Sequence, residues 1–239
     1  MPPILSTNQG TGPAYTELTN QGTGPAYTEL IRDELGRAVN HLVASLPPSV
    51  SLSANERRGI IARYSSVLEG NFVYWMTGAS LAAKSREAQA IIRDNLLEEV
   101  RDCHPGMLRN FAMAAQAAPS DSDALAVYAN LSKVRLFIGR LSPVPIVAMM
   151  AFFEDFIQRF MPYLAELAQQ QGSAEFEYTD VHSVCDSQHS QALFYALETE
   201  MTLLREPPAN LLEGVHLLEA LLQNIFTSDR IAKAATTAG

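Results

Sequence analysis

The sequence predicts an all-α protein, built as one domain from a bundle of seven or eight helices. After residue 30, apolar residues recur at three- and four-residue spacing, which is the period of a buried helix face. Clusters of Pro, Gly, Ser and Asp interrupt this pattern at intervals that suit helices of several turns. No stretch alternates β-branched with polar residues as a half-buried strand would. Long antiparallel helices around one core are therefore expected.

The breaks in the apolar pattern set the bounds of the expected helices. Ser53 and Glu56 have the spacing of a capping box, so the second helix is expected to begin directly after Ser53. The breaks fall at Pro47-Pro48, Thr77-Gly78, His104-Pro105-Gly106, Pro119-Ser120-Asp121, Ser142-Pro143, Gly172-Ser173 and Pro207-Pro208. The expected helices span residues 30–46, 54–76, 81–102, 107–117, 122–141, 144–171, 174–205 and 209–226.

The N-terminus carries a perfect repeat. TNQGTGPAYTEL occupies residues 7–18 and recurs unchanged at 19–30. Its Gly, Thr, Asn and Pro content is typical of turns and linkers, so residues 1–30 are expected to form an irregular arm. A binding role for Tyr15 and Tyr27 is the alternative. The bundle domain is then expected at 31–228, with a flexible tail at 229–239.

Composition excludes several classes of protein. Hydrophobic residues make up 47% of the 239 residues, enough for a sizeable core. The net charge of -9 repels phosphate backbones, so nucleic acid is not an expected partner. No apolar run reaches the ~20 residues that a membrane-spanning helix needs. Two cysteines are too few for a disulfide framework and the N-terminus lacks a secretory signal, so a cytoplasmic location is expected.

The segment from residue 178 to 189 holds the most informative motif. A helix turns by ~100° per residue, so His182, Asp186 and His189 lie on one face, with Tyr178 beside them. Two imidazoles and a carboxylate on one face suit iron, manganese or zinc. The alternative is a solvent-facing polar segment, because its other residues are also largely polar.

A second candidate ligand lies on the most apolar segment. Glu154 shares a helix face with Val147, Met150 and Ile157. A carboxylate facing a core is unfavourable unless it is paired or binds a metal ion. The alternative to a metal is a buried salt bridge, for instance to Arg63 or Arg135.

Further acidic and imidazole groups occur on the second and third helices. Glu99 shares a face with Ile92 and Leu96, and His104 follows the expected helix end. His104 could instead be a helix C-cap, where an imidazolium interacts favourably with the helix dipole. Glu69 lies on or beside the buried face of the second helix.

Together these motifs resemble a known family. Asn95-x3-Glu99, His104-Pro105, Glu154 and His182-x3-Asp186-x2-His189 are similar to the pattern of the heme-oxygenase-like di-iron oxidases, which have a TenA/PqqC-like fold. The resemblance is strongest to the CADD-like branch and covers roughly residues 55–225. It implies a seven-helix bundle that holds two irons. The metal ligands that it implies are Glu69, Glu99, His104, Glu154, His182, Asp186 and His189, with Glu98 as an alternative to Glu99.

The same resemblance implies an activity. The chain is expected to be a metal-dependent oxidase or oxygenase that acts on a small organic substrate with O2, using iron or manganese. In CADD-like proteins tyrosines near the metal are oxidised, which would give Tyr178 a catalytic role; an ordinary half-buried tyrosine is the alternative. A homodimer is implied only by the resemblance. Two other interpretations stay open: a non-catalytic protein that binds a protein partner, and metal-free chemistry of the pyrroloquinoline-quinone-synthase type.

Overall fold

The computed structural model describes the backbone of residues 25–237 and the side chains of residues 26–183 and 188–227. Over this range the chain forms eight α-helices, one short 3-10 helix and no strand, which confirms the predicted all-α bundle. Tyr15 and the first copy of the repeat lie outside the described residues. The helices are α1 (Pro25–Ala44), η1 (Ser49–Ser51), α2 (Ala54–Ala82), α3 (Arg86–Arg101), α4 (His104–Ala114), α5 (Asp121–Ile138), α6 (Pro143–Gln170), α7 (Glu177–Thr202) and α8 (Glu213–Thr237).

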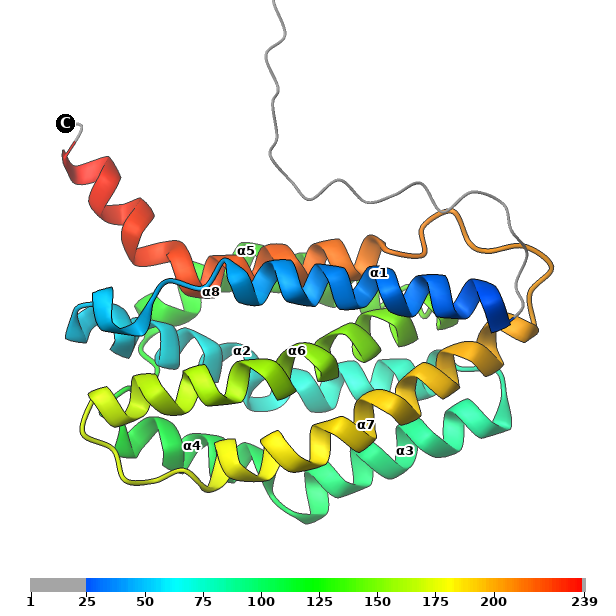
Figure 1. The fold of residues 1–239 in the computed structure, drawn as a ribbon, viewed down its shortest axis with the longest axis horizontal. Helices are drawn as coiled ribbons and strands as arrows, with labels where there is room; N and C mark the ends of the chain where they lie inside the picture. The colour runs from blue at the N-terminus through cyan, green and yellow to red at the C-terminus, as the bar shows by residue number, and fades with distance from the viewer. Residues whose placement is uncertain (1–24, 238–239) are drawn as a thin grey trace, which may run out of the picture.

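The central helix of the bundle is α6, which runs through the middle of Figure 1 with α1 on one side and α7 on the other. It packs against α1, α2, α7 and α8, and α7 is its most extensive neighbour. Every side chain from Val144 to Glu154 is buried, so this half of α6 has no solvent-facing side. A helix that is apolar all round needs neighbours on all sides.

The helix boundaries differ from the prediction at both ends of the chain. α1 already begins at Pro25, inside the second copy of the repeat, where an irregular arm was expected. Proline suits the first turn of a helix, and Tyr27 lies in the core at 3% exposure. The backbone of α8 continues to Thr237, into the expected flexible tail, where an alanine-rich sequence favours helix.

The break in α2 lies at a different glycine from the one that was expected. A break was expected at Thr77-Gly78, but the helix continues through it to Ala82. A Cβ on Gly78 would lie 2.4 Å from the Ile138 side chain, so this glycine allows α2 and α5 to approach closely. The actual break lies inside the expected helix, where Glu69 has ψ 72° and Gly70 has φ 114°.

The start of α3 is tied to the end of α7. Glu200 Oε1 accepts hydrogen bonds from the backbone N–H groups of Lys84 (2.8 Å) and Ser85 (2.7 Å). Ser85 is the N-cap of α3 and accepts a bond from Ala88 N–H. α3 and α7 therefore run antiparallel, and the first turns of α7 lie opposite the last turn of α3. None of the helices in the described part of the chain is long and apolar enough to span a bilayer.

Candidate metal centre

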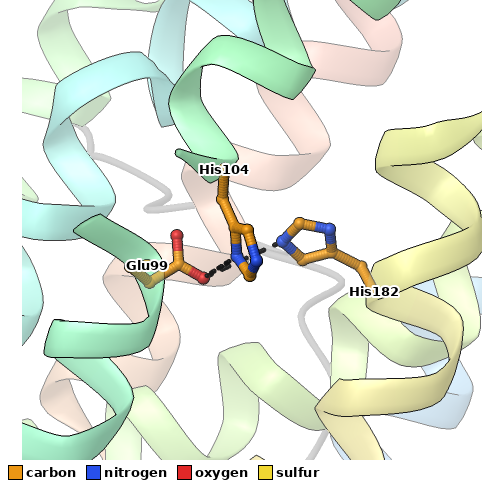
Figure 2. A group of neighbouring side chains, drawn as sticks. All are labelled: Glu99, His104 and His182. Atoms are coloured by element: carbon orange, nitrogen blue, oxygen red, sulfur yellow. Dashed lines mark hydrogen bonds and ion pairs between the residues drawn. The ribbon is translucent and has the colours of Figure 1, made fainter. Parts of the chain in front are cut away.

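Three buried side chains from three helices converge inside the bundle. Glu99 comes from α3, His104 from the first turn of α4 and His182 from α7, and each offers a ligand atom within 4.8 Å of the other two. Figure 2 shows the two imidazoles and the carboxylate pointing toward one another. The two imidazole rings meet edge to face, with 4.6 Å between their centroids. They form the only group of this kind among the described side chains.

A left-handed residue brings Glu99 and His104 together. Cys103, between α3 and α4, has φ 59° and ψ 39°, so the chain turns sharply between the two helices. Gly106 leaves room for this turn, because a Cβ there would lie 2.7 Å from Cys103 Sγ. As a result, His104 lies at the start of α4 and is not the C-cap of α3.

The backbone fixes which nitrogen of His182 faces the centre. His182 Nδ1 lies 2.7 Å from the carbonyl oxygen of Tyr178. A carbonyl only accepts, so Nδ1 carries the proton and Nε2 of a neutral ring presents a lone pair. Nε2 is 3.9 Å from Glu99 Oε1, too far for a hydrogen bond but suited to sharing a metal ion. Hydrogen bonding of the remote nitrogen to a carbonyl is typical of metal-ligating histidines.

The second imidazole is bonded directly to the carboxylate. His104 Nδ1 is 2.7 Å from Glu99 Oε1, and the two side chains are 3% and 7% exposed. Burial raises the pKa of Glu99, but the hydrogen bond with His104 and the nearby imidazoles lower it more, to about 2. Burial lowers the pKa of His104, and the bond to Glu99 raises it above its usual value. The carboxylate is therefore ionised at neutral pH.

The group faces a small buried cavity of about 20 Å³, room for about one water molecule or ion. Glu154, 2% exposed, and Tyr178, 3% exposed, reach the same cavity. The cavity is lined by Leu68, Phe72, Glu99, His104, Pro105, Leu108, Glu154, Ile157, Tyr178 and His182. Four of the predicted ligands thus surround one space: Glu99, His104, Glu154 and His182.

The remaining predicted ligands lie elsewhere. His189 is buried, and its Nε2 is 3.3 Å from Glu98 Oε2, so it forms a second imidazole–carboxylate pair between α3 and α7. Glu69 lies at the break in α2, is 32% exposed and forms an ion pair with Arg109 of α4. The Asp186 side chain lies outside the described residues. Arg135, considered as a partner for Glu154, donates to Asn71 Oδ1 at 2.8 Å.

One residue of the site was missed by sequence reasoning. The hydroxyl of Tyr64 on α2 is 2.8 Å from the hydroxyl of Tyr178, and both tyrosines are buried. The Tyr178 ring in turn packs on His182, with 4.2 Å between centroids. The available signal was spacing, since Tyr64 lies four residues before Leu68 of the cavity, on the same face of α2.

The donor set fits a transition-metal ion. Two imidazoles and one carboxylate are the ligand types of non-heme iron sites, and zinc and manganese also accept them. Glu99 is ionised, and Nε2 of His182 faces the group because Nδ1 is held by the Tyr178 carbonyl, which suits metal binding. The geometry therefore supports binding of at least one ion by Glu99, His104 and His182.

Comparison with known families agrees with this donor set. The model of a family described as iron-containing redox enzymes matches residues 62–221, which is 160 of the 239 residues. The matched segment contains all three residues of the group, together with Glu98, Glu154, Tyr178 and His189. It leaves out α1 and the first turns of α2. No protein with curated annotation matches the chain significantly.

Proposed function

The chain belongs to the iron-containing redox enzymes of the heme-oxygenase-like superfamily, and we propose that it is an iron-dependent oxidase or oxygenase acting on a small organic substrate with O2. The observation that carries this proposal is the buried group of Glu99, His104 and His182. Side chains alone do not activate O2, and bound iron would supply that redox chemistry.

The side chains around the cavity have separate roles in this proposal. Glu99 supplies negative charge that offsets the charge of a cation, and His182 presents Nε2 because the Tyr178 carbonyl holds Nδ1–H. Glu154 approaches the cavity from α6, where it could hold an ion or accept a proton. Leu68, Phe72 and Leu108 are buried apolar side chains in the cavity wall, and an apolar wall strengthens electrostatic interactions inside.

A second ion is proposed beside the first. Glu98 and His189 form an imidazole–carboxylate pair from the same two helices, α3 and α7, that carry Glu99 and His182. The motif also places Asp186 between the two histidines in sequence. This arrangement supports a di-iron centre in which Glu99, His104 and His182 hold one ion and Glu98 with His189 contributes to the other. Manganese would use the same nitrogen and oxygen donors.

Metal analysis of single variants tests the proposal. We expect protein purified anaerobically with ferrous iron to bind iron, His182→Ala to lose the ion at Glu99, and His189→Ala to retain that ion and lose only the second. His41→Ala, an exposed histidine on α1, is the matched control and should bind as wild type. Wild-type protein that retains no iron would overturn the proposal.

An oxygen-electrode measurement tests the reaction itself. Iron-loaded protein with a reductant should consume O2 faster than the same amount of free iron, and His182→Ala should not. Iron binding without O2 uptake across reductants and small organic additives would favour the non-catalytic binding protein. Tyr178→Phe belongs in the same assay, because a catalytic tyrosine predicts loss of activity with iron content unchanged.

A further inference from the structure

A second and larger hollow lies away from the metal centre, where α1 crosses α6 and α7. Its volume is about 460 Å³, within the range of small-molecule sites. Its lining residues are mostly polar or charged, with Phe194 as a buried aromatic surface at 6% exposure. We call it the α1 groove; its lining residues include Arg32, Gly36, Arg37, Arg159, Ser190 and Phe194.

A glycine keeps this groove open. Gly36 lies in the interior of α1, where glycine is less favourable than alanine by about 1 kcal/mol. It does not have a positive φ, and a Cβ built on it would meet nothing within 4 Å. Neither backbone conformation nor close packing therefore requires glycine there. The absence of a side chain at position 36 leaves space in the groove.

Charged side chains of both signs line the groove. Three arginines line it, against the carboxylates of Asp33 and Asp155. Two of the three are already engaged: Arg159 clamps Asp155 with bonds of 2.9 and 3.1 Å, and Arg37 pairs with Glu34.

The third arginine, Arg32, has capacity for a further partner. Its guanidinium lies over the Phe194 ring, 4.7 Å from the centroid. Its Nε is buried and has no hydrogen-bond partner among the described residues. Glu29 forms an ion pair with Nε at 3.7 Å, which is beyond hydrogen-bonding distance, and the Arg32 side chain is 43% exposed. Guanidinium groups held on aromatic rings are well suited to carboxylate and phosphate.

From the open space, the partly exposed Arg32 guanidinium and the aromatic floor, we propose that the α1 groove binds a small organic anion. In this proposal a carboxylate or phosphate group of the ligand accepts hydrogen bonds from Arg32. The rest of the ligand occupies the space beside Gly36. Asn40, Gln158, Ser190 and Gln191 offer uncharged hydrogen-bonding groups around it.

This site is distinct from the metal centre but is built on the same helices. Asp155 of the groove follows Glu154 of the cavity on α6, so the two sites occupy different faces of that helix. On α7 the groove begins at Ser190, eight residues beyond His182 of the cavity. The α1 wall lies outside the segment that matches the family. Binding in the groove therefore does not depend on the proposed redox function.

Isothermal titration calorimetry of the full chain, treated with chelator, tests the proposal. The probes are phenyl phosphate and benzoate, which share an aromatic body and differ in the anion. We expect at least one to bind, and Arg32→Gln and Gly36→Leu each to weaken its binding by about tenfold or more. Gly36→Leu fills the groove where no atom opposes a Cβ, so it should fold.

Three control variants show whether the probe binds in the groove or elsewhere on the protein. Gly36→Ala leaves most of the space, Arg140→Gln removes an arginine outside the groove, and His182→Ala alters the metal centre; all three should bind as wild type. No binding of either probe would overturn the proposal. Binding that is unchanged in both Arg32→Gln and Gly36→Leu would also overturn it. Loss of binding in His182→Ala alone would do the same.

Discussion

Single hydrogen bonds decide the chemical state of the metal centre. His182 Nδ1 is committed to a backbone carbonyl, whereas His104 Nδ1 is bonded to the carboxylate of Glu99. The proton between His104 and Glu99 occupies the place that a cation would take. Metal binding at this centre should therefore release a proton and weaken as the pH falls.

The same pair makes the stability of the metal-free protein depend on pH. The Glu99 pKa, lowered from 4.5 to about 2, gives stability above pH 4.5 that is lost as pH falls toward 2. The raised pKa of His104 gives stability that is complete below 6.5 and is lost as pH rises through that raised value. We expect the difference in unfolding free energy between wild type and Glu99→Gln to be largest between pH 4.5 and 6.5.

Urea unfolding of chelator-treated protein across this range measures that difference. The matched control is Glu87→Gln, which removes a carboxylate from the first turn of α3, away from the pair. A difference between wild type and Glu99→Gln that does not change with pH would contradict the assigned ionisation states.

The two buried tyrosines should show coupled stabilities. Tyr64→Phe removes one partner of the Tyr64–Tyr178 hydroxyl bond, and such a bond contributes about 0.5–1.5 kcal/mol to stability. We expect Tyr64→Phe/Tyr178→Phe to be less destabilised than the sum of the two single variants. A double-mutant cycle by urea denaturation measures the coupling, and additive effects would show that the hydroxyl bond contributes nothing.

At the scale of helices, α1 and α2 each contain a glycine with no neighbour within 4 Å of an added Cβ, but in different backbone conformations. Gly70 has φ 114°, so Gly70→Ala should destabilise by about 1–3 kcal/mol through backbone strain. Gly36 lies in a regular helix, so Gly36→Ala should stabilise by up to about 1 kcal/mol. Thermal and urea unfolding of both variants measure these changes. Changes in unfolding free energy of the same sign in both variants would contradict the kink at Gly70.

The helix break also explains a boundary that sequence reasoning could not place. Gly70 and Gly78 both lie within one apolar helical pattern, and the break was expected at Thr77-Gly78. Yet Gly78 stays helical because Ile138 packs on it, a contact from a helix sixty residues away. Whether a glycine permits close packing or a positive φ depends on its neighbours in space.

At the scale of the whole molecule, the proposed metal ion joins three helices. Its ligands come from α3, α4 and α7, so binding should favour the folded state over the unfolded chain. Iron or manganese at about 100 times its dissociation constant should stabilise the protein by about 2.7 kcal/mol. Scanning calorimetry with and without chelator measures the shift in Tm. His182→Ala should lose most of it and His41→Ala none.

Much of this architecture could be predicted, because the apolar periodicity of α6 and the polar breaks between helices are local signals. The metal centre was harder to predict from the sequence. His182 and Glu154 stood out, one by spacing and one by its apolar surroundings, but the partner of each depends on how the helices pack. The left-handed Cys103 that joins Glu99 to His104, and the pairing of Glu98 with His189, have no signature in a single sequence.

The cavity of about 20 Å³ has a kinetic consequence. If the proposed reaction takes place here, an organic reactant larger than one water molecule needs Leu68 or Phe72, which flank the break in α2, to move. The enzyme would then be gated, with turnover that slows in viscous solvent and changes little when the reactive bond is isotopically substituted.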